Sequence, residues 1–388
     1  MPAMQTDFSL LAELEHGLAE LDDRQLRRRR RVVDSPQGPH VEVDGRPYLN
    51  FCGNDYLGLA ADPRLKAAAV AAIDRYGVGS GASHLVCGHQ SPHQALEDRF
   101  AAFVGRPAAL LFSTGYMANL GVVTALVGRG DAVFADKLNH ASLNDACQLS
   151  RADFERFGHN DLAALERRLA ASTARRKLIA IDAVYSMDGD LAPVAELLAL
   201  AERYDAWLYL DDAHGFGVLG EGRGSAAHAG IASPRLIYLA TLGKAAGSAG
   251  ALVAAEAAVI DWLLNKAGTA IYTTAAPAAI AAATLAALDA IEHEPWRRER
   301  LAQHVERLRA GLAGSRYRLA PSQTPIQPIL LDDAGQALAL SQALFERGLW
   351  VAAIRPPTVA TARLRVTLSA LHADAEIDRL VATLLELQ

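Results

Sequence analysis

Short apolar runs alternate with amphipathic segments along most of the sequence. The runs are bounded by glycine or polar residues and are too short for helices, so they predict buried strands. They occupy residues 108–112, 132–135, 178–183, 206–210 and 236–240. Apolar residues at helical spacing lie between several of these runs, for example at 193–204. The alternation predicts an α/β fold with a mainly parallel central sheet that helices cover on both faces.

The sequence before these runs predicts a helix and a hairpin. Leucines at mainly three- and four-residue spacing predict a helix from Ser9, its cap, to Arg31, with a run of five arginines at its C-terminal end. Residues 40–51 predict a β-hairpin that turns at Asp44-Gly45. The arginine run is not interleaved with aromatic residues, so it indicates a solvated basic face or a collar for an anionic substrate rather than a nucleic-acid site.

After residue 288 the pattern changes. Helices are predicted at 297–312, 338–347 and 374–387, and strands at 326–331, 350–354 and 363–368. This order is typical of a smaller α+β domain. We therefore expect three parts: an N-terminal helix and hairpin (1–53), a large α/β domain (54–290) and a small C-terminal α+β domain (291–388).

Composition narrows the class of protein. The 388 residues carry a net charge of −6, which provides no overall attraction to nucleic acid or to an anionic membrane. Three cysteines cannot all pair with one another, so a reducing compartment, the cytoplasm, is expected. The uncharged stretch 269–288 is mostly alanine and threonine and contains Pro277. It is too weakly hydrophobic for a spanning helix and predicts a buried turn followed by a core helix.

Reactive side chains follow two of the predicted strands. Asp211, Asp212 and His214 come directly after one strand, and Thr241 and Lys244 follow the next. Because ligands gather at the carboxyl ends of parallel strands, these side chains are expected to meet in one place. An amine for a Schiff base and a carboxylate for the pyridine nitrogen are what pyridoxal phosphate requires. Taken singly, each residue is better explained as a solvated acid or a surface lysine.

Other turns supply the remaining parts of such a site. A polar turn with Gly115 and Tyr116 opens a helix after a strand, where free amides and the helix dipole suit a phosphate. His140 follows a strand and is the candidate for stacking on the cofactor ring, and Ser186 follows another strand. Arg355, framed by prolines, suits a substrate carboxylate. The alternatives are a merely satisfied buried histidine and a plain Arg-Pro-Pro turn.

A histidine-rich stretch raises the possibility of a metal site. Cys87, His89 and His93 lie close together, with His84 nearby. The Cys-x-His spacing is unusual for zinc, and the following helix adds no convincing ligand. We expect these to be polar loop residues and predict no metal.

The motifs together resemble one enzyme family. Together, LDDAHGFGVLG, TLGKAAG, STGYMAN, DKLNHASL and YSMDGD are similar to motifs of the pyridoxal-phosphate-dependent α-oxoamine synthases, and a chance match to all of them in order is hard to credit. The resemblance runs from about Arg27 to the C-terminus. It implies the aspartate-aminotransferase-like fold (type I), with a mainly parallel sheet in the large domain and a smaller α+β C-terminal domain.

The resemblance also implies roles for individual residues. Lys244 would carry the cofactor, Asp211 would pair with its pyridine nitrogen and His140 would stack on its ring. The other cofactor contacts implied are Gly115, Tyr116, Ser186, His214, Thr241, Thr273 and Thr274. The substrate contacts implied are Arg27, Asn54, His140, Arg355 and Thr358. The threonine pair would reach the phosphate of a neighbouring subunit, which implies a homodimer with shared active sites.

The segments NDYLGL and IRPPTV indicate one branch of the family. It condenses L-alanine with a 6-carboxyhexanoyl thioester of coenzyme A or of acyl carrier protein, with loss of CO2. A glycine-using sibling such as glycine C-acetyltransferase is the nearest alternative; an aminotransferase and a non-enzymatic coenzyme A- or nucleotide-binding module are more distant ones. The loop after Thr358 is two residues shorter than the family's usual Pro-x-Gly form. A shorter loop would shift Thr358 from its place in the family.

Overall fold

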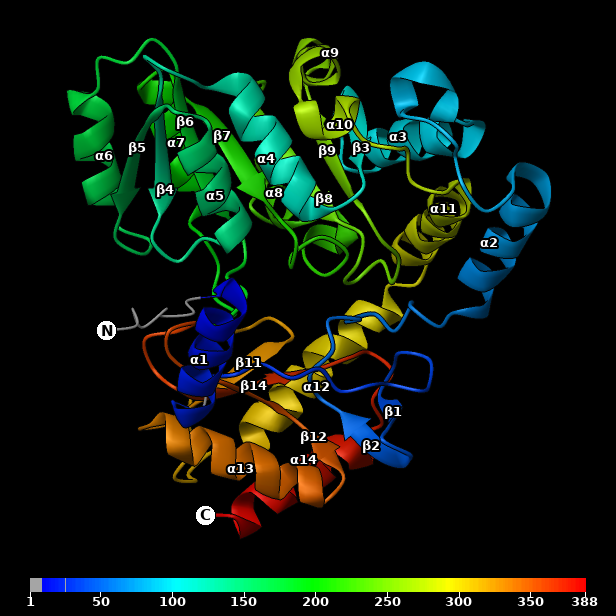
Figure 1. The fold of residues 1–388 in the computed structure, drawn as a ribbon, viewed down its shortest axis with the longest axis vertical. Helices are drawn as coiled ribbons and strands as arrows, with labels where there is room; N and C mark the ends of the chain where they lie inside the picture. The colour runs from blue at the N-terminus through cyan, green and yellow to red at the C-terminus, as the bar shows by residue number, and fades with distance from the viewer. Residues whose placement is uncertain (1–8, 25) are drawn as a thin grey trace, which may run out of the picture.

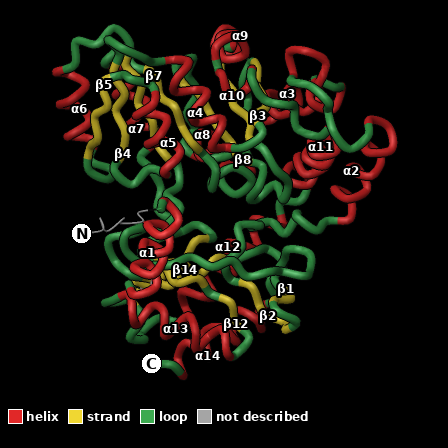
Figure 2. Tube along the Cα trace, in the orientation of Figure 1, coloured by secondary structure: helices red, strands yellow, loops and turns green. Residues whose placement is uncertain are grey.

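The computed structural model describes residues 9–24 and 26–388 and has two lobes (Figure 1). The upper lobe is built on a seven-stranded sheet, and the lower lobe holds two small sheets with their helices. Figure 2 shows that the strands form the interior of the upper lobe and that its helices lie around them. The expected α/β architecture is confirmed.

The large sheet has the strand order β3-β9-β8-β7-β6-β4-β5. Its strands are β3 (Ala108–Phe112), β4 (Ala132–Asp136), β5 (Asp153–Phe157), β6 (Lys177–Asp182), β7 (Trp207–Asp211), β8 (Leu236–Thr241) and β9 (Ala251–Ala255). The pairs among β4, β5, β6, β7 and β8 are parallel, and only β9 runs antiparallel to both of its neighbours. The carboxyl ends of β4, β6, β7 and β8 therefore lie along one edge.

Helices cover both faces of this sheet because its strands are apolar on both sides. Alternate residues of β7 show this: Tyr209 packs into one core with Val122 and Leu143, whereas Leu208 and Leu210 pack into the other. The first core is closed by α4 (Gly115–Leu126), α5 (Ala141–Leu149), α9 (Ala257–Lys266) and α10 (Gly268–Ile271). The second is closed by α3 (Ser91–Phe103), α6 (Leu162–Ala171), α7 (Val194–Arg203) and α11 (Ala278–His293). Short turns η1 (His84–Gly88) and η2 (Gly220–Gly222), with α2 (Pro63–Tyr76) and α8 (Ser225–His228), complete this lobe.

The lower lobe joins the two ends of the chain. One sheet has the order β1-β2-β12 and the other β10-β11-β14-β13. Their strands are β1 (His40–Val43), β2 (Arg46–Asn50), β10 (Arg318–Leu319), β11 (Ile326–Leu330), β12 (Leu349–Trp350), β13 (Ala352–Ile354) and β14 (Arg363–Thr367). The helices are α1 (Leu10–Asp23), α12 (Trp296–Gly311), α13 (Ala334–Glu346) and α14 (Asp374–Glu386). The hairpin before residue 53 thus shares a sheet with a strand near residue 350, and the division at 53 and 290 stays a prediction.

The prediction that the first helix reaches Arg31 is wrong. Ser9 caps the helix as expected, with its Oγ accepting from Ala12 N at 3.3 Å, but the helix ends at Asp23. The backbone N–H groups of Leu26 and Arg27 both donate to Leu21 O, which closes the turn early. The arginine run therefore follows the helix.

Further differences concern three strand predictions and one helix. The strand predicted at 350–354 is two strands, because β12 pairs with β2 whereas β13 pairs with β14 in the other sheet. Strands β5 and β9 and helix α6 were not predicted. Hydrophobic periodicity does not indicate which sheet a short segment joins, and this choice decides whether it becomes a strand.

Two local predictions are confirmed. Asp44 and Gly45 both have positive φ, 51° and 72°, as a tight hairpin turn requires. The uncharged stretch 269–288 forms α10, a turn and the first part of the core helix α11. No helix among the described residues combines the length and apolar content of a bilayer-spanning segment.

Candidate active site

A cavity of about 190 Å³ lies at the carboxyl ends of β4, β6, β7 and β8. Eight residues predicted from the sequence line it: Gly115, Tyr116, His140, Ser186, Asp211, His214, Thr241 and Lys244. Five that were not predicted also line it: Asn119, Ser142, Asp182, Val184 and Ala213. Residues from five separate segments of chain meet here because parallel strands end at the same edge of the sheet.

Lys244 lies three residues beyond the end of β8 and is half-buried. Its Nζ lies 3.4 Å from Thr241 Oγ1. Burial lowers the pKa of Lys244, against the opposing effect of the nearby carboxylates of Asp211 and Asp182. A lysine with a lowered pKa is a better nucleophile at neutral pH, because more of it is the free amine.

Asp211, the last residue of β7, is held rigidly. Its Oδ2 accepts a hydrogen bond from Asn119 Nδ2 at 2.8 Å, and its Oδ1 accepts from Ala213 N at 3.1 Å. Asp182 ends the adjacent strand β6, directly across from Asp211 in register. Burial, reinforced by the charge of Asp211, raises the pKa of Asp182 well above its usual range. Asp182 Oδ1 is buried without a hydrogen-bond partner among the described residues. A buried polar atom is normally hydrogen-bonded, so we expect a ligand to supply a polar group there.

The N-terminus of α4 forms one wall of the cavity. Thr114 caps the helix, its Oγ1 accepting from Met117 N at 3.1 Å. The first amides of a helix have no intrahelical acceptor and attract an anion. A Cβ at Gly115 would lie 2.6 Å from Thr241 Cγ2, so only glycine lets this backbone approach the end of β8. Tyr116 donates to Asp145 from the rim.

Two histidines border the cavity. His214 is buried, and its Nδ1 lies 2.7 Å from Tyr56 Oη. Burial lowers the pKa of His214 well below its usual value, so its ring is neutral at physiological pH. His140 is the N-cap of α5, and its backbone N–H donates to Asp182 Oδ2 at 2.8 Å.

Arg365 on β14 is a candidate that the sequence reasoning missed. It is buried, and its Nε donates to the backbone oxygen of Ser186 at 2.7 Å. Both terminal nitrogens lie 3.3 Å from Asn54 Oδ1. Its charge contributes to lowering the pKa of Lys244, after the larger effect of burial, which places the guanidinium near the amine. The signal was present in the sequence, because arginines at alternate positions of an otherwise apolar strand indicate a buried polar function.

Comparison with known proteins assigns the chain to a family. A family model described as aminotransferase class I and II matches residues 46–384. A relative from Chromobacterium violaceum named 8-amino-7-oxononanoate synthase is 60% identical over 377 residues, which cover 97% of this chain and 98% of the relative. A relative of the same name from Thiobacillus denitrificans is 61% identical over 380 residues, with the same two coverages. The chain belongs to the 8-amino-7-oxononanoate synthase family.

Solved structures give the same fold. A serine palmitoyltransferase from Sphingomonas wittichii superposes with a TM-score of 0.90 at 32% identity, over 99% of this chain and 98% of that one. A serine palmitoyltransferase from S. paucimobilis with a bound PLP–myriocin aldimine superposes with a TM-score of 0.92 at 29% identity, over 97% and 98%. The expected type I fold and the resemblance to this family are confirmed.

The cavity fits the cofactor of the 8-amino-7-oxononanoate synthase family. It offers an amine at Lys244, a carboxylate at Asp211, helix amides for a phosphate at the start of α4, and a buried unsatisfied oxygen at Asp182. These are the groups that pyridoxal phosphate needs for attachment, ring protonation and phosphate binding.

Six residues expected at this family's site do not line the cavity of the single chain. Asn54 lies beside Arg365, with its Oδ1 3.3 Å from both terminal guanidinium nitrogens. Arg27 is exposed and pairs with Asp22 at 2.5 Å. Arg355 is half-buried and Thr358 is exposed. Thr273 and Thr274 lie in the turn before α11, where Thr274 forms a β-bridge with Ser83. Their roles stay predictions.

The histidine cluster is arranged differently from the sequence expectation. Cys87 is exposed, and the side-chain nitrogens that lie within 4.8 Å of one another are those of His84, His89 and His93. His93 has both ring nitrogens engaged: Nδ1 accepts from Gln90 N at 3.0 Å, and Nε2 lies 2.7 Å from a backbone oxygen. Because Nε2 must donate its proton there, His93 cannot ligate a metal without losing these bonds, and the prediction of no metal stands untested.

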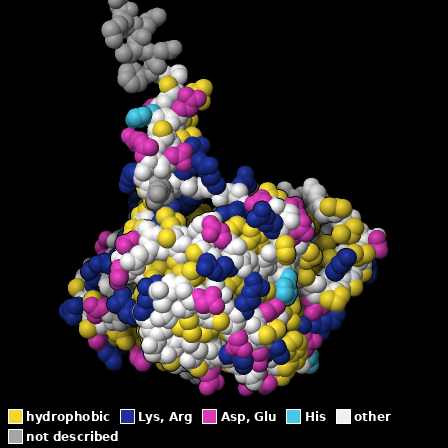
Figure 3. Space-filling view, turned by 90° about the horizontal axis from the view of Figure 1, so that it is seen from below, with side chains coloured by type: hydrophobic (Ala, Val, Ile, Leu, Met, Phe, Trp, Pro, Cys, Tyr) yellow, Lys and Arg dark blue, Asp and Glu magenta, His cyan; other side chains and the backbone are white. Residues whose placement is uncertain are grey.

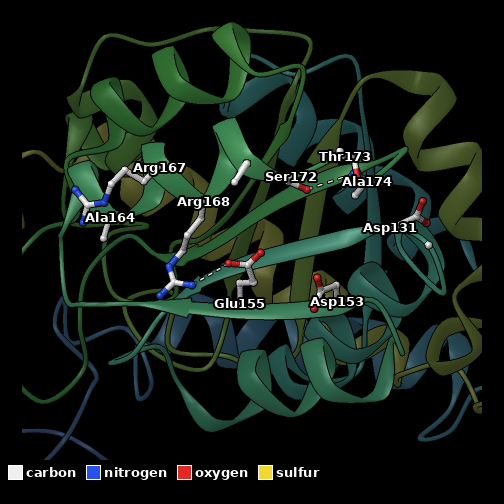
Figure 4. A pocket seen from close by; sticks show the side chains of 11 residues that line it. Asp131, Asp153, Glu155, Ala164, Arg167, Arg168, Ser172, Thr173 and Ala174 are labelled. Carbon is white, nitrogen blue, oxygen red and sulfur yellow. Dashed lines mark hydrogen bonds and ion pairs between the residues drawn. The ribbon is translucent and has the colours of Figure 1, made fainter.

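A larger hollow of about 580 Å³ lies at the far edge of the sheet, beside β5 and α6 (Figure 4). Two of its charges, Arg168 and Glu155, pair with each other at 2.8 Å, and Asp131 lies 3.2 Å from Arg175. It contains neither lysine nor histidine. Size alone therefore does not identify the reactive site.

Proposed function

We propose that this chain catalyses the decarboxylative condensation of a 6-carboxyhexanoyl thioester with L-alanine. The products are 8-amino-7-oxononanoate, CO2 and the free thiol, and the reaction belongs to biotin biosynthesis. The full-length relatives at about 60% identity named 8-amino-7-oxononanoate synthase support this assignment. The structural observation that carries it is that the half-buried Lys244, with its lowered pKa, lines one cavity with Asp211.

Lys244 has two tasks in this reaction. Its amine would attach the cofactor until the amino group of alanine displaces it, and the released amine would then accept the Cα proton of the bound amino acid at Nζ. Bound pyridoxal phosphate supplies a protonated ring that withdraws electrons from Cα and so acidifies that proton. The lowered pKa of Lys244, caused first by burial, keeps the amine competent as a base near neutral pH.

Other residues orient the reactants. Asp211, fixed by Asn119, is placed to keep the ring nitrogen protonated. His140 borders the same space and is placed to cover one face of the ring and to donate to the oxygen of the attacked thioester. Arg365 suits the carboxylate of alanine because a guanidinium binds a carboxylate through two parallel bonds. Arg355 is the alternative for this task, and neither arginine is among the residues that line the cavity.

The enzyme acts as a homodimer with shared active sites. The loop at 77–86 and the turn at 272–276 lie side by side through the Ser83–Thr274 bridge. They expose Val78, Val86 and Tyr272, which are 75%, 78% and 87% accessible. An apolar patch of this kind marks a surface that a partner covers. A second copy covering it would receive Thr273 and Thr274 near its own phosphate site.

Helix α1 supports the same assembly. It stands out from the body of the molecule (Figure 3), and none of its described residues is buried. Leu10 and Leu14 are 70% and 56% accessible. An amphipathic helix of this length gains most of its stability from packing its apolar face, so a second copy is the natural cover. The free thiols of Cys52, Cys87 and Cys147 suit the reducing cytoplasm.

The decisive test replaces the lysine. Lys244→Ala is expected to abolish product formation and the visible absorbance of lysine-attached cofactor, because no other described amine lines the cavity. Lys66→Ala, an exposed position on α2, is the control and should retain both. Turnover by Lys244→Ala would overturn the proposal. Release of the thiol with alanine or glycine and a panel of acyl-CoA esters separates this reaction from that of a glycine-using sibling.

Sharing of active sites has its own test. Chains carrying Lys244→Ala are mixed, after unfolding and refolding together, with chains carrying Thr273→Ala and Thr274→Ala. Each homodimer is expected to be weak or inactive, and the mixture should regain up to roughly a quarter of wild-type activity, since only one of the two sites in a heterodimer is intact. No recovery, with heterodimers shown by mass spectrometry, would contradict shared sites.

A further inference from the structure

A chain of buried hydrogen bonds ends on His140. Tyr209 Oη donates to Asn119 Oδ1 at 2.7 Å. Asn119 Nδ2 donates both to Asp211 Oδ2 at 2.8 Å and to Ser142 Oγ at 2.9 Å. Ser142 Oγ lies 2.7 Å from His140 Nδ1. Tyr209, Asn119 and Ser142 are at most 2% accessible, so water does not compete for the bonds among these three residues, whereas His140 itself is exposed.

The bonds made by Asn119 have one direction each, and a backbone donor sets the direction at His140. The amide of Asn119 presents its nitrogen to Ser142, so Ser142 Oγ accepts there and its own proton is available to His140 Nδ1. A second donor acts on the same atom: Ser142 N–H donates to His140 Nδ1 at 3.3 Å, because His140 is the N-cap of α5. A backbone N–H cannot accept, so Nδ1 carries no proton while these bonds persist.

We propose that Ser142 and Asn119 are positioning residues that confine the proton of neutral His140 to Nε2, so that this histidine presents a fixed N–H donor to the cavity. Within the described part of the chain no group hydrogen-bonds Nε2, which leaves it for a ligand. The opposite tautomer would present a lone pair there and would repel a developing oxyanion. Which ligand oxygen receives this bond rests on the proposed function; the tautomer itself does not.

The same amide links His140 to the acid of the site. Asn119 donates one N–H to Asp211 and the other to Ser142. The same side chain therefore orients both the acid that would face the cofactor's pyridine nitrogen and the serine that contacts His140. The charged neighbours of His140 are Asp211 from β7, Lys244 after β8 and Asp145 on α5. Burial lowers the pKa of His140 despite the two acids, so the neutral, singly protonated ring is the form present at physiological pH.

The test reads the tautomer directly. Protein labelled with ¹⁵N-histidine, in the cofactor-free and cofactor-loaded forms, is analysed by long-range ¹H–¹⁵N correlation, with His140→Gln to assign the signal. Wild type is expected to show a protonated Nε2 and an unprotonated Nδ1 in both forms. Ser142→Ala is expected to show a mixture of tautomers and a His140 pKa raised by about half a unit to one unit, as loss of one hydrogen bond implies. Ser142→Thr, which keeps the hydroxyl, should restore the wild-type pattern.

Kinetics provide the second readout. In Ser142→Ala, kcat is expected to fall by roughly threefold to tenfold with less than about twofold change in KM for alanine, and the acid limb of the pH profile should move upward. Gln148→Ala, exposed on the same helix, should leave kcat and the tautomer unchanged. A protonated Nδ1 in wild type, or an unchanged tautomer and pKa in Ser142→Ala, would overturn the proposal. If the tautomer is as expected but Lys244→Ala retains turnover, the proposed function fails while this inference stands.

Discussion

His159 is held between two carboxylates on loops that carry site residues. Its Nδ1 lies 3.3 Å from Asp136 and its Nε2 lies 2.7 Å from Asp190 Oδ2. Asp136 ends β4, just before the turn to His140, and Asp190 closes the loop that carries Ser186. The imidazolium therefore ties together the two loops on either side of the cavity. Replacing it in His159→Gln keeps a polar side chain of similar length and removes the charge.

The expected loss of stability follows from the electrostatics. Hydrogen bonds to Asp136 and Asp190 raise the pKa of His159 from 6.5 to about 10. At ~1.4 kcal/mol per pKa unit, full coupling to folding would amount to ~5 kcal/mol. The imidazole is 30% accessible, so water screens part of this, and we expect His159→Gln to lower the free energy of unfolding by about 2–3 kcal/mol at pH 7.

The contribution of His159 to stability depends on pH in a defined direction. A group whose pKa is raised on folding contributes stability that is fully present below its unfolded pKa, near 6.5, and is lost as the pH rises through about 10. Urea unfolding of wild type and His159→Gln at several pH values is the assay. The difference between them should be largest near pH 6 to 7, should shrink steadily as the pH rises toward about 10, and should be nearly absent above it. Affinity for the cofactor, measured by absorbance titration, should also fall because the Ser186 loop loses an anchor.

The control is an exposed pair of the same kind. His40 lies 2.8 Å from Glu376, and its side chain is 73% accessible. His40→Gln is expected to change the free energy of unfolding by less than about 0.5 kcal/mol. A His159→Gln effect as small as this, or one that does not vary between pH 7 and pH 10.5, would refute the reasoning.

Two further predictions concern Arg365 and Gly247. Arg365→Lys should raise KM for alanine by roughly tenfold or more in steady-state assays, because an ammonium cannot reproduce a two-bond contact with a carboxylate; an unchanged KM would return that task to Arg355. Gly247→Ala should lower the melting temperature and cofactor occupancy, since a Cβ there would lie 2.4 Å from the backbone of Leu59 and Ala60. Gly230→Ala, at nearly the same φ (64° against 62°) but with open space, isolates the clash and should cost only about 1 kcal/mol in unfolding experiments.

Much of the site was predictable because its residues follow strands. Asp211, Thr241 and Lys244 stand directly after apolar runs, and the end of a buried strand in a parallel sheet is one place in space. His140 and Ser186 were predicted by the same argument. The structure lines one cavity with all of them.

The residues that were missed reach the site because distant elements pack together, and they do not follow a strand of the large sheet. Asn119 and Ser142 lie inside helices, where a polar residue is usually unremarkable, and only the approach of α4 and α5 brings them to Asp211 and His140. Arg365 comes from a strand in the other lobe and reaches Ser186 over 179 residues of chain. Contacts between elements distant in sequence leave no local periodicity to read.

By itself, the sequence determined the kind of layers and the chemistry available: strand-length apolar runs require cover on both faces, and their ends carry a lysine, an acid and a histidine. Tertiary structure decided which chain segments pair and which arginine lies near the lysine. It placed β9 antiparallel, split 350–354 between two sheets and brought Arg365 rather than Arg355 to the lysine. The reason is physical: side-chain period and burial are local properties, whereas the partner of a strand and the depth of a charge depend on the whole fold.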